Sequence, residues 1–277
     1  MIYSISDIHA HYRELYGRID QLGNLEPFIS GDNQLILLGD YLDRGLNSKK
    51  VLELIFSLQQ SIGSENIIVL KGNHESWFLQ FLDGESNEWL PEDTNLLTSR
   101  TFLDSEQMAK IQEMAFNGRL NVIYDFIRES IKSNDPELIA WLRKLPNYWE
   151  SPETGTIFTH AGIDEESGEL WKSTTPDDMF TGKYPLTTGK FYKDIVSGHV
   201  AASSIAENQN FKGIYYDGES HYFIDGAVEQ TGNLLVLAYD EKNRNYYELE
   251  EETTEDKHLN YTRETRLQIR GNLKALN

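Results

Sequence analysis

The chain has 277 residues, of which 39% are hydrophobic, enough for one large domain with a sizeable core. Asp and Glu number 45 against 25 Lys and Arg, and the resulting formal charge of −20 disfavours nucleic acid or an anionic membrane as the main partner. The absence of cysteine excludes disulfides, thiolate metal sites and cysteine nucleophiles.

The first 75 residues are predicted to form three units of an apolar strand and a polar turn, the first two followed by a helix. The expected strands are residues 1–5, 34–38 and 66–70, and the expected helices are 11–22 and 48–62, with Ser48 as an N-cap. No basic leader precedes the first strand and no stretch is long enough to span a membrane, so we expect a cytoplasmic protein. Open α/β sheets carry their chemistry at the carboxyl ends of strands, where these polar turns lie.

The rest of the chain is predicted to leave the sheet and return to it within a single domain of residues 1–250. A helical excursion at 76–145 contains expected helices at 77–82, 105–116, 122–131 and 136–145. Strands are expected at 156–159 and 194–196, followed by short antiparallel strands near 213–216, 222–224, 234–239 and 246–250. The charged segment 251–277 is compatible with a surface helix, a tail or an interaction segment.

Side chains that can bind metals follow five of the predicted strands. They are Asp7, His9, Asp40, Asn73, His160 and His199. Oxygen and imidazole donors without sulfur suit Mn, Fe or Zn. Six ligands are many for one catalytic ion, but they suit two ions about 3.5–4 Å apart that share a carboxylate and a water. We expect Asp40, on the middle strand, to be shared, and the bridging water to attack a phosphoryl group as hydroxide.

Three charged residues near these ligands are candidates for catalysis. Arg44 presents a planar fork that matches phosphate oxygens, and the alternative is an ordinary salt bridge to Asp43. His74 follows Asn73 and is expected to protonate the leaving oxygen as a general acid. Asp43 is expected to orient His74 and keep it cationic. With Arg44, Asn73 is also counted among the substrate-binding residues.

The ordered motifs resemble those of the calcineurin-like metallophosphoesterases, most closely the bacterial serine/threonine phosphoprotein phosphatases. They lie at 6–10 (SDIHA), 39–45 (GDYLDRG), 72–75 (GNHE), 160–162 (HAG) and 198–199 (GH). The resemblance implies an α/β four-layer sandwich of two mixed β-sheets flanked by helices. It also implies two metal sites, one formed by Asp7, His9 and Asp40 and the other by Asp40, Asn73, His160 and His199, with Mn the expected metal.

The chain departs from the family pattern in the first motif and beyond HAG. Ser6 and Ala10 stand where the family usually has glycine. Many relatives carry a second phosphate-binding arginine after a Trp beyond HAG, and this chain has Lys172 after Trp171. Lys172 is therefore the candidate for a second substrate-binding cation; the alternative is that no residue replaces this arginine.

The leading hypothesis is a dinuclear metal-dependent phosphatase that hydrolyses phosphomonoesters, with phosphoserine or phosphothreonine on proteins as substrate. The alternative is hydrolysis of dinucleoside polyphosphates or another small phosphoester. Relatives of that kind often lack the second Asp of the GDxxDRG motif, so the presence of Asp43 and Arg44 favours the phosphatase. A non-catalytic binding module is disfavoured because the metal ligands and His74 are all present.

Overall fold

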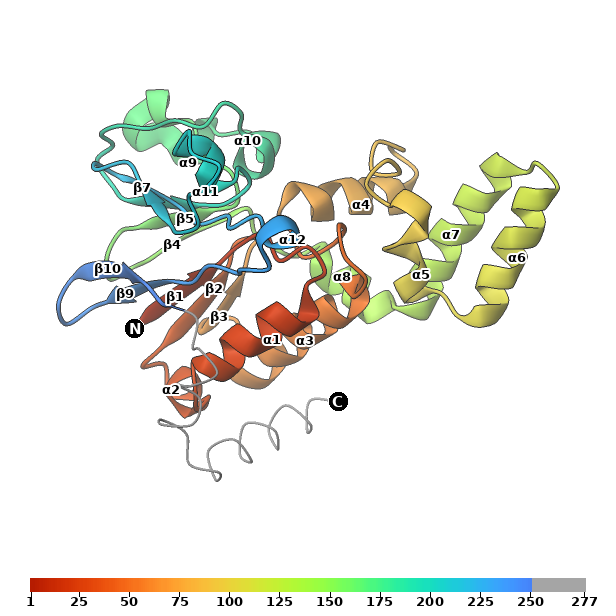
Figure 1. The fold of residues 1–277 in the computed structure, drawn as a ribbon, viewed down its shortest axis with the longest axis horizontal. Helices are drawn as coiled ribbons and strands as arrows, with labels where there is room; N and C mark the ends of the chain where they lie inside the picture. Colours follow the sequence, from red (N-terminus) through yellow and green to blue (C-terminus); the bar gives the residue numbers. More distant parts are fainter. Residues whose placement is uncertain (251–277) are drawn as a thin grey trace.

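Two five-stranded β-sheets face each other in the computed structural model, which describes residues 1–250 (Figure 1). The first sheet has three neighbouring parallel strands, β1 (Ile2–Ile5), β2 (Gln34–Leu37) and β3 (Ile67–Val69). It is extended beside β1 by two antiparallel strands, β9 (Leu237–Asp240) and β10 (Asn245–Glu248). The predicted segment 251–277 lies outside the described residues.

The second sheet has a parallel centre and antiparallel edges. Its central strands are β5 (Ile157–Thr159), β6 (Ile195–Ser197) and β8 (His221–Phe223). Its edges are β4 (Tyr148–Glu150), which pairs with β5, and β7 (Tyr215–Tyr216), which pairs with β8. The predicted sandwich of two mixed sheets flanked by helices is thereby confirmed.

Helices cover the outer faces of both sheets and form the excursion. In chain order they are α1 (Tyr12–Gln21), α2 (Glu26–Ile29), α3 (Ser48–Ile62), α4 (Asn73–Asp83), α5 (Ser99–Phe102), α6 (Ser105–Phe116), α7 (Leu120–Asn134), α8 (Pro136–Leu142), α9 (Trp171–Thr174), α10 (Asp177–Gly182), α11 (Ala202–Ile205) and α12 (Val228–Thr231), with 3₁₀ turns η1 (Thr94–Leu96) and η2 (Glu165–Leu170). Among residues 1–250 no helix is both long and apolar enough to cross a bilayer.

Three apolar clusters hold the layers together. Successive side chains of a strand point to opposite faces, so β2 places Leu35 and Leu37 in a cluster with the helices and Ile36 in a cluster between the sheets. The second sheet contributes Phe158 and Val196 to the cluster between the sheets. A third cluster packs α9 and α10 on the outer face of the second sheet (Figure 1). Burial on both faces explains why the strands read as continuous apolar runs.

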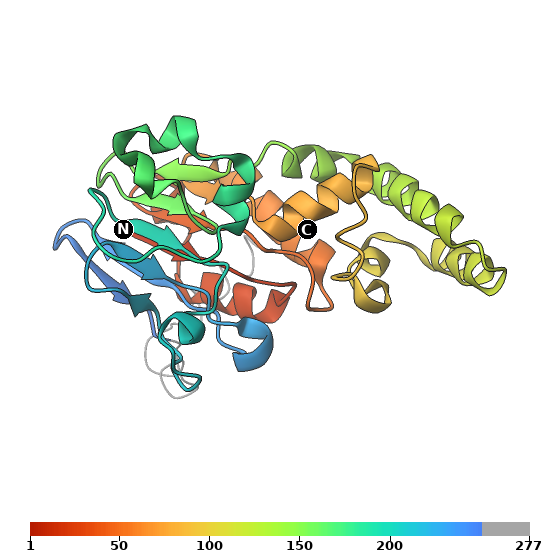
Figure 2. The ribbon, with the colours of Figure 1, turned by 90° about the horizontal axis from the view of Figure 1, so that it is seen from above.

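The helical excursion has a part near the sheets and a part that projects from them. Figure 2 shows α6 and α7 extending side by side away from both sheets. Helix α6 begins where predicted, because Asp104 accepts from the backbone N of Gln107 (2.8 Å) and Gln107 Oε1 accepts from the backbone N of Asp104 (3.0 Å). Helix α8 begins at Pro136, whose missing N–H costs nothing in a first turn.

Element boundaries shift by a few residues from the sequence predictions, and three further differences have a physical reason. The strands after His199 were expected to be antiparallel, but β8 runs parallel to β6, because residues 198–220 are long enough for a crossover connection. The short strand β4 was not predicted, since three partly buried residues give no periodic pattern. Ser48 is the first residue of α3, and the N-cap is Asn47. The Ser48 hydroxyl lies instead within hydrogen-bonding distance of the Thr98 hydroxyl.

Candidate active site

The predicted metal ligands come together where the parallel strands of both sheets end. Asp7 and His9 follow β1, Asp40 follows β2, and Asn73 begins α4 just after β3. From the facing sheet, His160 follows β5 and His199 follows β6. These are six buried or half-buried residues. Two sheets packed face to face thus bring their loops to one place.

The loops that carry these residues adopt left-handed backbone conformations that side chains rarely occupy. Positive φ angles occur at Asp7 (52°), His9 (43°), Asp40 (55°), Asp43 (66°) and His199 (67°). Each costs conformational free energy, and such residues concentrate at functional sites when the surrounding structure holds them in place. The strain therefore marks this end of the sandwich as a site.

Glycine is required where two of the loops touch. A β-carbon at Gly72 would lie 2.1 Å from Asp40 Oδ1, and one at Gly198 would lie 2.1 Å from Asp7 Oδ2. Both contacts are far shorter than van der Waals distance. The glycines of GNHE and GH thus let the two carboxylates reach the centre of the group of six predicted ligands, which we call the cluster.

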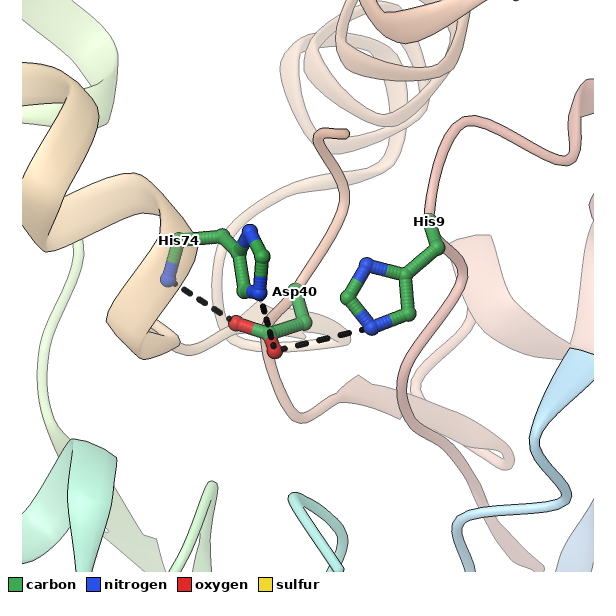
Figure 3. A group of neighbouring side chains, drawn as sticks. All are labelled: His9, Asp40 and His74. Atoms are coloured by element: carbon green, nitrogen blue, oxygen red, sulfur yellow. Dashed lines mark hydrogen bonds and ion pairs between the residues drawn. The ribbon is translucent and has the colours of Figure 1, made fainter. Parts of the chain in front are cut away.

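Asp40 is shared by two groups of possible ligands. In the first, His9 Nε2 lies 3.7 Å from Asp40 Oδ2 (Figure 3). The same nitrogen lies 3.9 Å from Asp7 Oδ1. In the second, His160 Nε2 lies 3.4 Å from the same Asp40 oxygen. Atoms of Asp40, His160 and His199 lie within 4.8 Å of one another, as do atoms of Asp40, His9 and His74. The geometry allows one carboxylate to serve two ions.

Asn73 joins the second group, and Asp7 links the first group to it. The side-chain oxygen of Asn73 lies 3.0 Å from His160 Nε2, and Asp7 Oδ2 accepts from the backbone N of His199 (2.9 Å). All six predicted ligands are therefore brought together by the fold, although His160 and His199 follow Asp40 by more than a hundred residues in the chain.

The hydrogen bonds of the ligand histidines suit metal binding, but the pKa values of these histidines differ. The Nδ1 atoms of His9 and His160 face backbone carbonyls, Leu42 O at 3.0 Å and Leu38 O at 3.1 Å, which leaves each Nε2 facing Asp40. Burial lowers the pKa of His9 to about 3, so its ring is neutral as a ligand must be. Burial alone would lower the pKa of His160, but Asp40 raises it to about 9, so an ion bound there would have to displace a proton. Burial alone would raise the pKa of Asp40, but the neighbouring imidazoles hold it well below its usual range.

His74 and Asp43 form a buried pair beside the cluster. His74 Nδ1 donates to Asp43 Oδ2 at 2.7 Å, and neither side chain is exposed. Burial alone would lower the pKa of His74, but Asp40 and Asp43 raise it to about 9. His74 Nε2 lies 3.8 Å from Asp40 Oδ2, so the ring directs its second nitrogen to the cluster (Figure 3). The pair has the geometry of a general acid and its orienting carboxylate.

Arg44 lies across the mouth of the cluster and does not pair with Asp43. Its Nη1 donates to His9 Nε2 at 3.1 Å, and its Nη2 lies 3.3 Å from His74 Nε2. Two carboxylates flank it, with Glu92 Oε2 4.0 Å from Nε and Glu229 Oε1 3.6 Å from Nη1. With 43% of its side chain exposed, Arg44 is accessible to a ligand.

Lys172 is the one predicted side chain that the structure does not bring to the cluster. Its Nζ contacts Glu150 Oε2 on the outer edge strand of the second sheet. Glu150 pairs with Ile157, the first residue of β5, whereas His160 follows the last. Lys172 therefore lies at the opposite end of β5 from the metal ligands.

Glu75 supports the site in a way that the sequence reasoning did not predict. Its carboxylate, fully buried, accepts from the backbone N atoms of Asp40 (2.8 Å), Tyr41 (2.8 Å) and Gly72 (3.0 Å). It thereby fixes the loop that carries Asp40. The place of Glu75 in the GNHE motif could have drawn attention to it. Its role could not be predicted, because hydrogen bonds to the backbone N–H groups of another loop leave no pattern in the sequence.

Asp225 is a further buried carboxylate of the cluster that the sequence reasoning did not assign. Burial and the nearby carboxylate of Asp7 raise its pKa well above the usual range. One of its oxygens accepts from the backbone N of Ala227 at 2.7 Å. Asp225 follows β8, the third parallel strand of the second sheet, so the same strand-end rule that identified His160 and His199 applies to it.

Comparisons with known proteins agree with this geometry. The model of a family described as calcineurin-like phosphoesterase matches residues 1–242. A symmetrical bis(5'-nucleosyl)-tetraphosphatase from Photorhabdus laumondii is 28% identical over 197 residues, 70% of this chain and 57% of the relative. Serine/threonine-protein phosphatase 2 from Escherichia coli is 31% identical over 132 residues, 47% of this chain and 55% of the relative. The chain thus spans about half the length of these curated relatives.

A solved structure shares the fold at low sequence identity. A cold-active protein-tyrosine phosphatase from a Shewanella species superposes with a TM-score of 0.52 at 15% identity. The match covers 90% of this chain and 80% of the other. At that identity the likeness concerns the fold alone.

Proposed function

This chain belongs to the calcineurin-like phosphoesterase family, and we propose that it is a metal-dependent phosphatase acting on phosphomonoesters, with phosphoserine and phosphothreonine on proteins as substrates. One observation carries the proposal. Asp40 is shared by two groups of ligand atoms, directly beside the Asp43–His74 pair and under the guanidinium of Arg44. Phosphoryl transfer needs this combination of concentrated positive charge, a proton donor and a phosphate clamp.

The family implies a dinuclear divalent metal centre, and the cluster has the donors to hold it. Asp7, His9 and Asp40 would hold one ion, and Asp40, Asn73, His160 and His199 the other. Oxygen and imidazole donors lead us to propose manganese, with iron or zinc as alternatives. The ions would supply positive charge for the phosphoryl oxygens and lower the pKa of a nucleophilic water.

The residues around the cluster would bind the phosphate and move one proton. Arg44 would turn its guanidinium from His9 to the phosphate oxygens, where two parallel hydrogen bonds fix the group. His74, held by Asp43 and protonated at neutral pH, would give its Nε2 proton to the leaving oxygen. Asn73, at the start of α4, would face the same phosphate.

The carboxylates around Arg44 favour a monoester over a polyphosphate chain. Glu92 and Glu229 approach Arg44 from two different segments, so negative charge surrounds the entrance to the cluster. A phosphomonoester brings one dianionic group, whereas a dinucleoside tetraphosphate brings a chain of charged groups past the same carboxylates. Like charges in such close contact disfavour binding.

Hydrolysis of dinucleoside polyphosphates remains the alternative, because relatives named for it match most of the chain. The two proposals separate in a turnover assay with Mn²⁺, in which phosphoserine and phosphothreonine peptides are compared with diadenosine tetraphosphate. We expect the peptides to be the better substrates. A clear preference for the tetraphosphate would contradict the proposed substrate and favour the alternative. If neither substrate is turned over while metal is bound, the proposal that this chain is an enzyme is wrong.

Replacement of His74 tests its role as the acid. We expect His74→Asn to lower kcat for substrates with poor leaving groups by roughly 10²–10⁴-fold and to spare activated esters. Metal content, measured by elemental analysis, should not change. Loss of metal would show instead that His74 is a ligand, as its place near His9 and Asp40 also permits.

A further inference from the structure

Two side chains from the excursion reach the buried carboxylate of the catalytic pair. Asp43 Oδ2 accepts from the indole Nε1 of Trp89 at 2.9 Å as well as from His74, and Asp43 Oδ1 accepts from Thr98 Oγ1 at 2.5 Å. Trp89 and Thr98 are fully buried, like Asp43. Both belong to the segment between α4 and α6, residues 84–104, to which the sequence analysis assigned no site residue.

Thr98 also closes a ring of hydrogen bonds that returns to Asp43. The backbone N of Asp43 donates to Ser48 Oγ at 3.3 Å, and Ser48 Oγ lies 3.1 Å from Thr98 Oγ1. The Thr98 hydroxyl donates its one proton to Asp43 Oδ1, so the Ser48 hydroxyl must donate to Thr98 Oγ1. The direction of every bond in the ring is thereby fixed.

The segment that supplies these donors is itself held rigidly. The Trp89 ring packs against Phe78 and Phe81 of α4, with both pairs of ring centroids 5.0 Å apart. Asp93 Oδ1 accepts from the backbone N atoms of Thr98 (2.7 Å) and Ser99 (3.1 Å). Two donors on a fixed segment leave the Asp43 carboxylate with a single orientation.

We infer that Trp89 and Thr98 are positioning residues for catalysis. They hold Asp43 so that its Oδ2 atom orients the His74 ring, and His74 Nε2 then points at the cluster. Without them the carboxylate is free to rotate, and the proton on His74 no longer meets the leaving oxygen in a fixed geometry. This inference rests on the proposed role of His74 as the acid.

The first test compares Thr98→Val, which keeps the shape and removes the hydroxyl, with Thr98→Ser, which keeps the hydroxyl. Phenyl phosphate releases phenolate, which is a poor leaving group. With this substrate we expect Thr98→Val to lower kcat roughly 10- to 100-fold, the usual cost of losing a residue that holds another site residue in place. KM, metal content and kcat for 2,4-dinitrophenyl phosphate should change little. Thr98→Ser should restore kcat for phenyl phosphate. An equal loss on both esters, or no rescue by serine, would overturn the inference.

A second test does not depend on activity. The Nδ1 proton of His74, identified by its absence in His74→Asn, should give a downfield ¹H NMR signal in the wild-type protein. We expect this signal to move upfield and broaden in both Thr98→Val and Trp89→Phe. An unchanged signal in two folded variants would show that neither residue positions the pair.

A double-mutant cycle separates this inference from the proposed function. If Thr98 acts through His74, Thr98→Val should cause no further loss of phenyl phosphate turnover in a His74→Asn background. Additive losses would contradict positioning. If His74→Asn itself shows no dependence on the leaving group, the proposed role of His74 fails, and the NMR signal still decides whether Trp89 and Thr98 hold the pair.

Discussion

The two sheets contribute to one site in unequal ways. Loops of the first sheet carry the shared carboxylate, the acid pair and the arginine, as well as three other ligands; these are Asp7, His9, Asp40, Asp43, Arg44, Asn73 and His74. Loops of the second sheet carry two imidazoles, His160 and His199. The first sheet thus supplies the groups that we propose for phosphate chemistry, and the second completes the proposed ligand set.

Asp40 is the point where the two contributions meet. Its Oδ2 atom lies 3.7 Å from His9 on its own sheet and 3.4 Å from His160 on the facing sheet. The cluster of apolar side chains between the sheets holds these loops at that separation. Neither sheet therefore forms the site alone, and the variants below test what each sheet contributes.

The largest effect is expected for Asp40→Asn. An amide in place of the shared carboxylate removes a charge from both ligand groups, so both ions should bind weakly. Activity should fall by more than the roughly 10- to 100-fold cost of losing an outer-shell partner. Phosphatase assays and Mn²⁺ titration check this, with the exposed Asp178→Asn as a matched control. Normal metal binding by Asp40→Asn would show that the two groups do not share this residue.

A smaller effect should separate the two cations assigned to substrate binding. Arg44→Met removes charged hydrogen bonds of about 1.5–3 kcal/mol, so KM should rise roughly 10- to 100-fold. Lys172→Met removes an ion pair with Glu150 and a contact with the Trp171 ring, neither of which is at the cluster, and KM should change less than about twofold. Steady-state kinetics of the two variants measure both values. A large KM increase for Lys172→Met would mean that the second sheet also binds substrate.

The smallest effect concerns stability at the far side of the second sheet. His221 on β8 is buried between Asp217 Oδ2 (2.8 Å) and Glu165 Oε2 (2.9 Å). Burial alone would lower the pKa of His221, but these carboxylates raise it above 6.5. His221→Gln should lower the free energy of unfolding by about 1–3 kcal/mol near pH 6 and leave kcat unchanged.

The pH dependence of that loss has a definite sign. Because the folded-state pKa is raised, the stabilisation by protonated His221 is complete below the unfolded pKa and disappears as pH rises through the folded pKa. The difference between wild type and His221→Gln should therefore shrink at alkaline pH in urea unfolding experiments. A difference that stays constant from pH 6 to pH 10 would show that the charge on His221 does not contribute.

Most of the site could be predicted because its residues follow local apolar strands. Asp7, Asp40 and His160 each come one to three residues after a buried run, and the strand-end rule identifies them without any knowledge of the fold. The pairing of Asp43 with His74 followed from chemistry, and the structure brings the two side chains into contact. The helix at 48–62 was predicted from its periodicity, with its N-cap misplaced by one residue.

The remainder depends on tertiary contacts that leave no local pattern. Trp89 and Thr98 lie in an irregular segment, and nothing in their spacing indicates that they meet Asp43. Glu75 binds backbone N–H groups, which any sequence provides. Lys172 was assigned by its place after a tryptophan, but the chain between His160 and β6 packs α9 on the outer face of the sheet. Sequence spacing in such a loop does not determine which way a side chain points.

The number of metal ions bound per chain tests the central claim most directly. The wild-type protein, equilibrated with Mn²⁺ and freed of excess metal by dialysis, should retain two ions per chain by elemental analysis. Two ions in the wild type and neither in Asp40→Asn is the result that a shared carboxylate predicts. One ion or none in the wild type under metal-replete conditions would contradict a dinuclear site built across the two sheets.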